Sequence, residues 1–214
     1  AIGEILLVVI GILIALSINN WNQFEKDGVK EKSILINVKE NLKINDSLIN
    51  DYVKSHLKNN HSSQIIIETL TNNRPYSDTL NVHFNRARFQ IVGSNYLSYI
   101  GYEELKNVGF DIIRNEVLKN EILKLFEVTY SSKIQKLTWF DQLDPHREKN
   151  LYDNFIDSKG FLKPINYDSL LLDNYYISMI TALKIHRVYW IEMLNKCKLK
   201  TQKLNELINN ELKK

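Results

Sequence analysis

The sequence predicts an all-α protein in which one N-terminal transmembrane helix continues into an antiparallel helical bundle. The chain opens with a largely apolar run of eighteen residues, Ala1 to Ile18, in which Glu4 is the one formal charge. Glycine and proline are few, at 7 and 3 in 214 residues, which argues against a many-turned β architecture. Long stretches space apolar residues three and four apart, as amphipathic helices do. The expected divisions are a transmembrane helix (1–22), a juxtamembrane connection (23–28) and an extramembrane helical bundle (29–214).

The apolar run has the length and the flanks of a membrane span. Eighteen helical residues cover about 27 Å, close to the hydrocarbon thickness of a bilayer. Three asparagines then surround Trp21, an amphipathic ring of the kind that anchors a helix at the lipid–water interface. Two alternatives are a secretory signal peptide cut near Ala15-Leu16-Ser17, although no basic segment precedes it, and the buried core helix of a soluble protein. Because Ala1 already lies inside the run, we expect a short flank before it.

One face of this helix differs from the others. At about 100° per residue, the following residues lie within roughly 60° of Glu4: Val8, Gly11, Ala15, Asn19 and Asn22. We call these six residues the seam. Gly11 and Ala15 form a small-xxx-small pair, which lets two helix backbones approach closely, and an intramembrane Glu normally faces a partner or water. The seam therefore predicts self-association. The alternative is a lone anchor, with Glu4 near the lipid headgroups.

Two helical stretches are expected between the anchor and Pro75. Apolar residues from Val29 to Leu57 predict a helix of about thirty residues that can run on from the anchor as a stalk. Residues 62–72 predict a second stretch, although the three isoleucines 65–67 also suit a short strand. The sequence Asn72-Asn73-Arg74-Pro75 ends it, and residues 75–95 have no regular pattern.

Further helices follow to the end of the chain. Ser94 is the expected N-cap of a helix that ends before Gly109, and a longer helix opens near Asn115 and runs to Phe140. Pro145 interrupts that pattern. Residues 146–172 are expected to be a connection with a short helix. From Asp173 a last helix of roughly forty residues runs to the end of the domain.

Composition excludes several functional classes. The formal charge is +3, and 28 basic residues are spread among 25 acidic ones without a dense block, so we expect no nucleic-acid partner. The single cysteine, Cys197, excludes an internal disulfide and a cysteine-based metal site; its lysine neighbours suggest an exposed or half-exposed position. No H-E-x-x-H motif, glycine-rich phosphate loop or G-x-S-x-G motif occurs. We therefore expect no catalysis, no cofactor and no metal.

Three polar groups are candidate sites. Glu103 and Glu104 are adjacent on a predicted helix and point about 100° apart, so a structural role beside packed neighbours is favoured over a two-carboxylate site. A solvated turn is favoured over a metal site for one group of acidic and histidine residues, Asp141, Asp144, His146 and Glu148. A candidate surface patch for lipid headgroups or an acidic partner contains His83, Arg86 and Arg88 beside Phe84 and Phe89, with an ordinary surface segment as the favoured alternative.

Two motifs resemble an uncharacterised bacterial family of single-span membrane proteins, a domain of unknown function. The first is GEI-x-LVVIGI-x-IAL-x-INNWN at residues 3–22, and the second is the YEELK-x-x-G box at residues 102–109. Family members carry a short basic segment before the anchor, which is not present in this chain. The resemblance implies an N-terminus in the cytoplasm and residues 25–214 in the periplasm, anchored in the bacterial inner membrane; it implies no activity.

These observations favour a membrane-anchored, self-associating helical protein that serves as a binding, sensing or scaffold module. Its expected partners are the lipid bilayer, further copies of itself through the transmembrane helix, and other subunits of a membrane complex. The alternative is an oligomeric ion channel whose pore is lined by the polar seam of the transmembrane helix.

Overall fold

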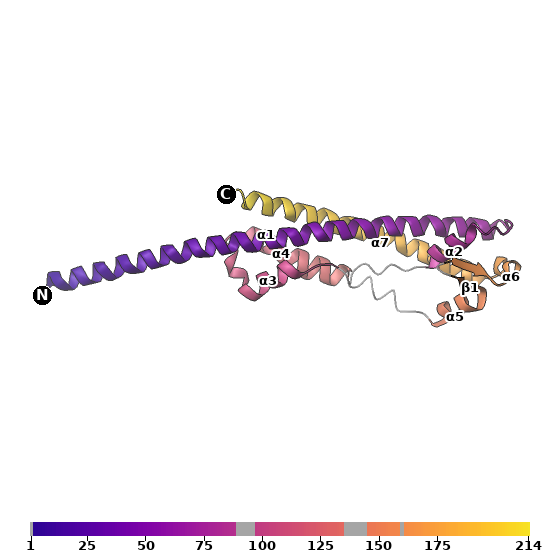
Figure 1. The fold of residues 1–214 in the computed structure, drawn as a ribbon, viewed down its shortest axis with the longest axis horizontal. Helices are drawn as coiled ribbons and strands as arrows, with labels where there is room; N and C mark the ends of the chain where they lie inside the picture. The colour runs from indigo at the N-terminus through magenta and orange to yellow at the C-terminus, as the bar shows by residue number, and fades with distance from the viewer. Residues whose placement is uncertain (1, 89–96, 135–144, 159–160) are drawn as a thin grey trace.

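The computed structural model describes residues 2–88, 97–134, 145–158 and 161–214. The protein is a rod built on two long antiparallel helices, α1 (Ile2–Thr71) and α7 (Asn174–Glu211), and α7 packs along the part of α1 that follows the apolar run (Figure 1). The N-terminal part of α1 projects alone from the bundle (Figure 1). The all-α prediction is confirmed.

α1 is a single helix of 70 residues. Residues 23–28, expected as a connection, are helical, and the two predicted stretches 29–57 and 62–72 belong to the same helix. The strand alternative for residues 65–67 is therefore wrong. α1 ends at Thr71, as predicted, and Asn73 follows in the left-handed region with φ 49°, which asparagine tolerates. The domain is consequently built directly onto the continuation of the apolar helix.

The half of the bundle nearer the N-terminus contains α3 (Ile100–Val108), η2 (Phe110–Ile112), α4 (Glu116–Leu123) and η3 (Lys124–Ile134), which has π-helical hydrogen bonding. Gly109 follows α3 with φ 101°, a conformation that favours glycine. Asn115 caps α4 as predicted, its side chain accepting hydrogen bonds from the backbone N–H groups of Val117 and Leu118. The expected N-cap Ser94 and the predicted continuation to Phe140 lie outside the described residues.

The far half contains α2 (Leu80–Arg88), α5 (Pro145–Asn154), β1 (Phe155–Ser158), β2 (Phe161–Pro164) and α6 (Tyr167–Leu171). β1 and β2 pair antiparallel, with Phe155 opposite Pro164. This hairpin corrects the expectation of a connection with one short helix over residues 146–172. Each strand has only four residues, so its alternation of apolar and polar side chains is too short to be recognised in the sequence. Buried side chains such as Phe155 and Leu162 hold the hairpin in place.

Two hydrophobic cores lie along the rod. The first joins α1 between Ile34 and Ile49 to α3, α4, η3 and the C-terminal half of α7. The second joins the end of α1 to α2, β1, β2, α6 and the start of α7. Between them α1 and α7 bury polar side chains, among them His56, Ser63 and Arg187. The core is thus interrupted by a polar layer halfway along the bundle.

Candidate functional site

The apolar end of α1 is uncovered. From Leu7 to Ile18 its large side chains are 48–75% exposed. Within the described residues, one helix is long and apolar enough to cross a membrane, by length and composition, and none of its apolar window is buried. The alternative of a buried core helix is therefore wrong, because such a helix would be covered by the rest of the chain. The signal-peptide alternative passes the same test of length and composition.

The seam lies on this uncovered end. Val8, Gly11, Ala15, Asn19 and Asn22 are exposed on α1, and a Cβ added at Gly11 would meet nothing within 4 Å. The side chain of Glu4 lies outside the described residues. Among the residues that the structure describes, none covers this face of α1.

Arg114 joins the bundle to α1 one turn beyond Trp21. Its guanidinium carbon lies 3.6 Å from the centre of the Phe24 ring, and its Nη2 donates a hydrogen bond to the carbonyl of Phe24. Its backbone N–H donates to Glu31 Oε1 at 2.9 Å. A Cβ on Gly28 would lie 3.3 Å from Arg114 Nη2, so the glycine leaves room for the guanidinium. No pattern in the sequence selects Arg114, because its contacts lie 83 and 90 residues away.

Three asparagines on one face of α1, Asn37, Asn41 and Asn45, bind α3 and the segment that leads into it. We call them the asparagine ladder. Asn45 Oδ1 accepts a hydrogen bond from the Ser98 N–H at 2.7 Å, and its Nδ2 donates to the Ser98 carbonyl at 2.9 Å. Asn41 Oδ1 accepts from the Gly101 N–H at 2.7 Å. Because the first N–H groups of a helix lack partners within it, Asn41 acts as a cap supplied by another helix.

Gly101 brings α3 against the backbone of α1. A Cβ at this position would lie 2.5 Å from the carbonyl oxygen of Asn37 and 2.8 Å from the backbone nitrogen of Val38. No side chain fits at these distances without moving one helix. The contact explains why a glycine occurs within the first turn of α3, where the sequence offered no reason for it.

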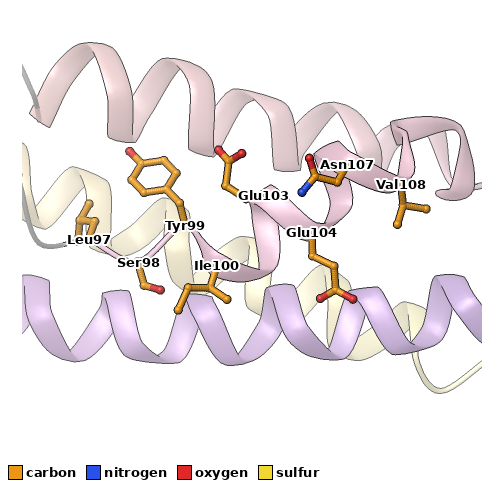
Figure 2. A pocket seen from close by; sticks show the side chains of 8 residues that line it. All are labelled: Leu97, Ser98, Tyr99, Ile100, Glu103, Glu104, Asn107 and Val108. Carbon is orange, nitrogen blue, oxygen red and sulfur yellow. The ribbon is translucent and has the colours of Figure 1, made fainter.

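The outer face of α3 carries an open groove of about 730 Å³ (Figure 2). Figure 2 shows Ile100 and Glu104 directed toward α1, whereas Glu103 and Asn107 point the other way. Glu104 accepts a hydrogen bond from Asn37 Nδ2 at 2.7 Å, and the neighbouring Tyr102 and Leu105 are buried. The two carboxylates thus diverge, as expected from their spacing, and Glu104 pairs with an asparagine rather than with a lysine or arginine.

The polar layer is formed by His56 and Ser63 of α1 with Arg187 and Trp190 of α7. Arg187 donates to Ser63 Oγ at 2.5 Å and to the carbonyl of Ala87, which links α7 to α1 and α2. The rings of His56 and Trp190 lie 5.2 Å apart. Burial, and secondarily the charge of Arg187, lowers the pKa of His56 to about 4, and burial lowers the pKa of Arg187 to about 10. His56 is therefore neutral at pH 7.

The candidate patch at His83, Arg86 and Arg88 is tied into the fold. Arg88 donates to Asp157 at 2.8 Å, and Phe84 is buried in the second core. His83 Nδ1 lies 3.1 Å from Ser62 Oγ, and burial, followed by the charge of Arg86, lowers its pKa. Phe89 lies outside the described residues. His83 and Arg88 thus have partners within the chain, and the role of the patch stays a prediction.

Three remaining expectations concern the cysteine, the aromatic residues of α7 and the acidic group beside Pro145. Cys197 is buried in the first core, so the expectation of an exposed or half-exposed thiol is wrong. Helical spacing suggests core or interhelix positions for four aromatic residues of α7, Tyr175, Tyr176, Tyr189 and Trp190. Tyr176 and Trp190 are buried, whereas Tyr175 and Tyr189 are exposed. Asp141 and Asp144 lie outside the described residues. Among the residues that the structure does describe, no group of three or more His, Cys, Asp and Glu side chains could hold a metal ion.

Comparison with known proteins locates one similarity. Residues 4–70 match a family of unknown function, DUF6090. The match covers about a third of the chain and includes the apolar segment and most of α1. It stops before the YEELK-x-x-G box, so the resemblance at that box stays an expectation. No curated protein and no solved structure matches the chain.

Proposed function

We propose that this chain is a membrane-anchored helical protein that self-associates through the seam of its apolar helix and presents its bundle as a binding, sensing or scaffold module without catalysis. One observation carries the proposal. The N-terminal part of α1 projects from the bundle with its apolar side chains exposed, and one face of it, the seam, holds Gly11, Ala15 and two of the three asparagines beside Trp21. Lipid satisfies the apolar faces, whereas a polar, small-residue face in lipid is best satisfied by another helix.

The continuity of α1 supports a scaffold role. Because the apolar segment and the asparagine ladder belong to one helix, association of the seams would set the distance and rotation between neighbouring bundles. The resemblance of the opening motif to single-span bacterial membrane proteins further supports an anchor in the inner membrane with the bundle in the periplasm. Protease added to intact spheroplasts should then digest the bundle, whereas a cytoplasmic bundle would resist.

Paired glycine substitutions test the seam. Gly3 and Gly11 lie on the same helix, and a Cβ at either would meet nothing within 4 Å, but Gly3 lies about 80° away from Gly11, outside the seam. We expect the purified full chain to be oligomeric in detergent by native mass measurement. Gly11→Leu should convert it to monomers, because the larger side chain separates the backbones, and Gly3→Leu should not.

Three outcomes are informative. A monomeric wild-type chain would refute self-association. Equal effects of the two substitutions would refute the seam as the interface. The channel hypothesis predicts in addition that the reconstituted chain conducts ions and that Glu4→Gln changes the flux, which a scaffold does not require.

A further inference from the structure

We propose that the outward face of α1 beyond the anchor binds the same face of a second copy of this chain, so that two α1 helices run in parallel as far as Ile36. The contact residues are Val29 and Ile36, which we call the outer stripe. The inference rests on the proposed self-association and extends it from the membrane segment into the domain.

The outer stripe lies opposite the bundle. Val29 is 73% and Ile36 45% exposed, although both are apolar and lie among charged neighbours. Around the axis of α1, the buried residues Val38, Leu42 and Ile49 lie roughly 160–200° from the direction of Glu4. Val29 and Ile36 lie within about 40° of that direction, on the opposite face of the helix. Two copies can therefore approach through their outer stripes while both bundles stay on the outside.

The outer stripe continues the spacing of the seam. Apolar or small residues recur every seven positions along α1, with one asparagine among them, at Val8, Ala15, Asn22, Val29 and Ile36. A strict seven-residue repeat drifts by about 20° per heptad on a straight helix, and two such helices stay in contact by left-handed supercoiling. Three of the five are β-branched, a residue type that parallel two-stranded coiled coils use at one of their two core positions, and a single asparagine at such a position specifies the register. The repeat spans roughly 42 Å of helix.

The orientation and the charges fit a second copy. Copies inserted in one bilayer share a single orientation, so their α1 helices must lie parallel rather than antiparallel. Glu25 and Lys26 are both exposed on opposite edges of the repeat. A two-fold axis between parallel helices places Glu25 of each copy beside Lys26 of the other, which pairs opposite charges just outside the membrane.

Single-cysteine cross-linking in membranes tests this geometry. The native Cys197 is buried, so the wild-type chain provides the background. Val29→Cys and Ile36→Cys should each form a disulfide-linked dimer on oxidation, because residues at this repeat position face each other in a parallel pair. Lys30→Cys is the matched control, since Lys30 is also exposed but is turned by about 100° from Val29. A second variant, Val29→Asp with Ile36→Asp, should raise the dissociation constant of the dimer on the order of a hundredfold, because it places unpaired like charges in the contact.

Each outcome decides a different point. An oligomer by mass with cross-links at residues 29 and 36 several-fold above the Lys30→Cys level supports the inference. An oligomer without these cross-links, or with an unchanged dissociation constant in the double variant, overturns the inference and leaves association through the seam in place. A monomer by mass refutes both. Circular dichroism of the double variant controls for folding, and its helical content should be unchanged because both positions are exposed.

Discussion

Replacement of Asn45 by alanine should destabilise the domain by releasing the segment before α3 from α1. Asn45 is fully buried, and its side chain makes two hydrogen bonds with the backbone of Ser98, at 2.7 and 2.9 Å. Loss of each neutral bond costs about 1 kcal/mol, and the released Ser98 groups are half-buried, so water satisfies them only in part. We therefore expect Asn45→Ala to lower the free energy of unfolding by about 2 kcal/mol, or roughly thirtyfold in the folded-to-unfolded ratio.

The assay is urea unfolding of the full-length chain in detergent, followed by circular dichroism, together with amide hydrogen exchange at Ser98. Asn37→Ala is the matched control, because Asn37 belongs to the same ladder but makes an exposed bond to Glu104. Its expected cost is below about 1 kcal/mol. Equal costs for the two variants, or an unchanged exchange rate at Ser98 in Asn45→Ala, would refute the role assigned to the ladder.

Three further predictions use the same unfolding assay. Gly101→Ala should cost roughly 1–3 kcal/mol, because its Cβ would lie 2.5 Å from the carbonyl oxygen of Asn37 and α3 would have to shift. Gly3→Ala, where no atom lies within 4 Å, is the control and should be neutral. For His56, whose pKa is about 4 in the folded state and 6.5 in an unstructured peptide, the unfolded chain binds the proton first, so stability should fall from pH 6.5 to pH 4 by about 3 kcal/mol. His56→Gln should flatten that pH profile, and an unchanged profile would contradict a buried neutral imidazole. Arg114→Ala should lower the free energy of unfolding by about 1 kcal/mol, because the contacts with Phe24 and Glu31 are lost. Amide hydrogen exchange should become faster near residue 28 but not in the polar layer. Equally faster exchange in both places would argue against a local role of Arg114 where the bundle meets α1.

The elements that could be predicted from the sequence are those decided by near neighbours. The end of α1 before Asn72, the start of α4 after Asn115 and the start of α7 after Asp173 all depend on backbone and side-chain groups within a few residues. The same holds for the apolar run and for the residues that share the seam, since helical periodicity alone places them. The four-residue strands β1 and β2 escaped prediction because too few residues alternate in them.

The sequence by itself determined an all-α chain with an apolar N-terminal helix, one polar face on that helix, and the caps of its later helices. Only the tertiary structure decided that Asn45 supports the segment before α3, that Arg187 lies in a buried layer and that Cys197 is covered. The partners of Asn45 and Arg187 lie 53 and 124 residues away along the chain. Periodicity and capping report neighbours within one or two turns, whereas the burial of a polar side chain depends on which distant backbone comes to meet it.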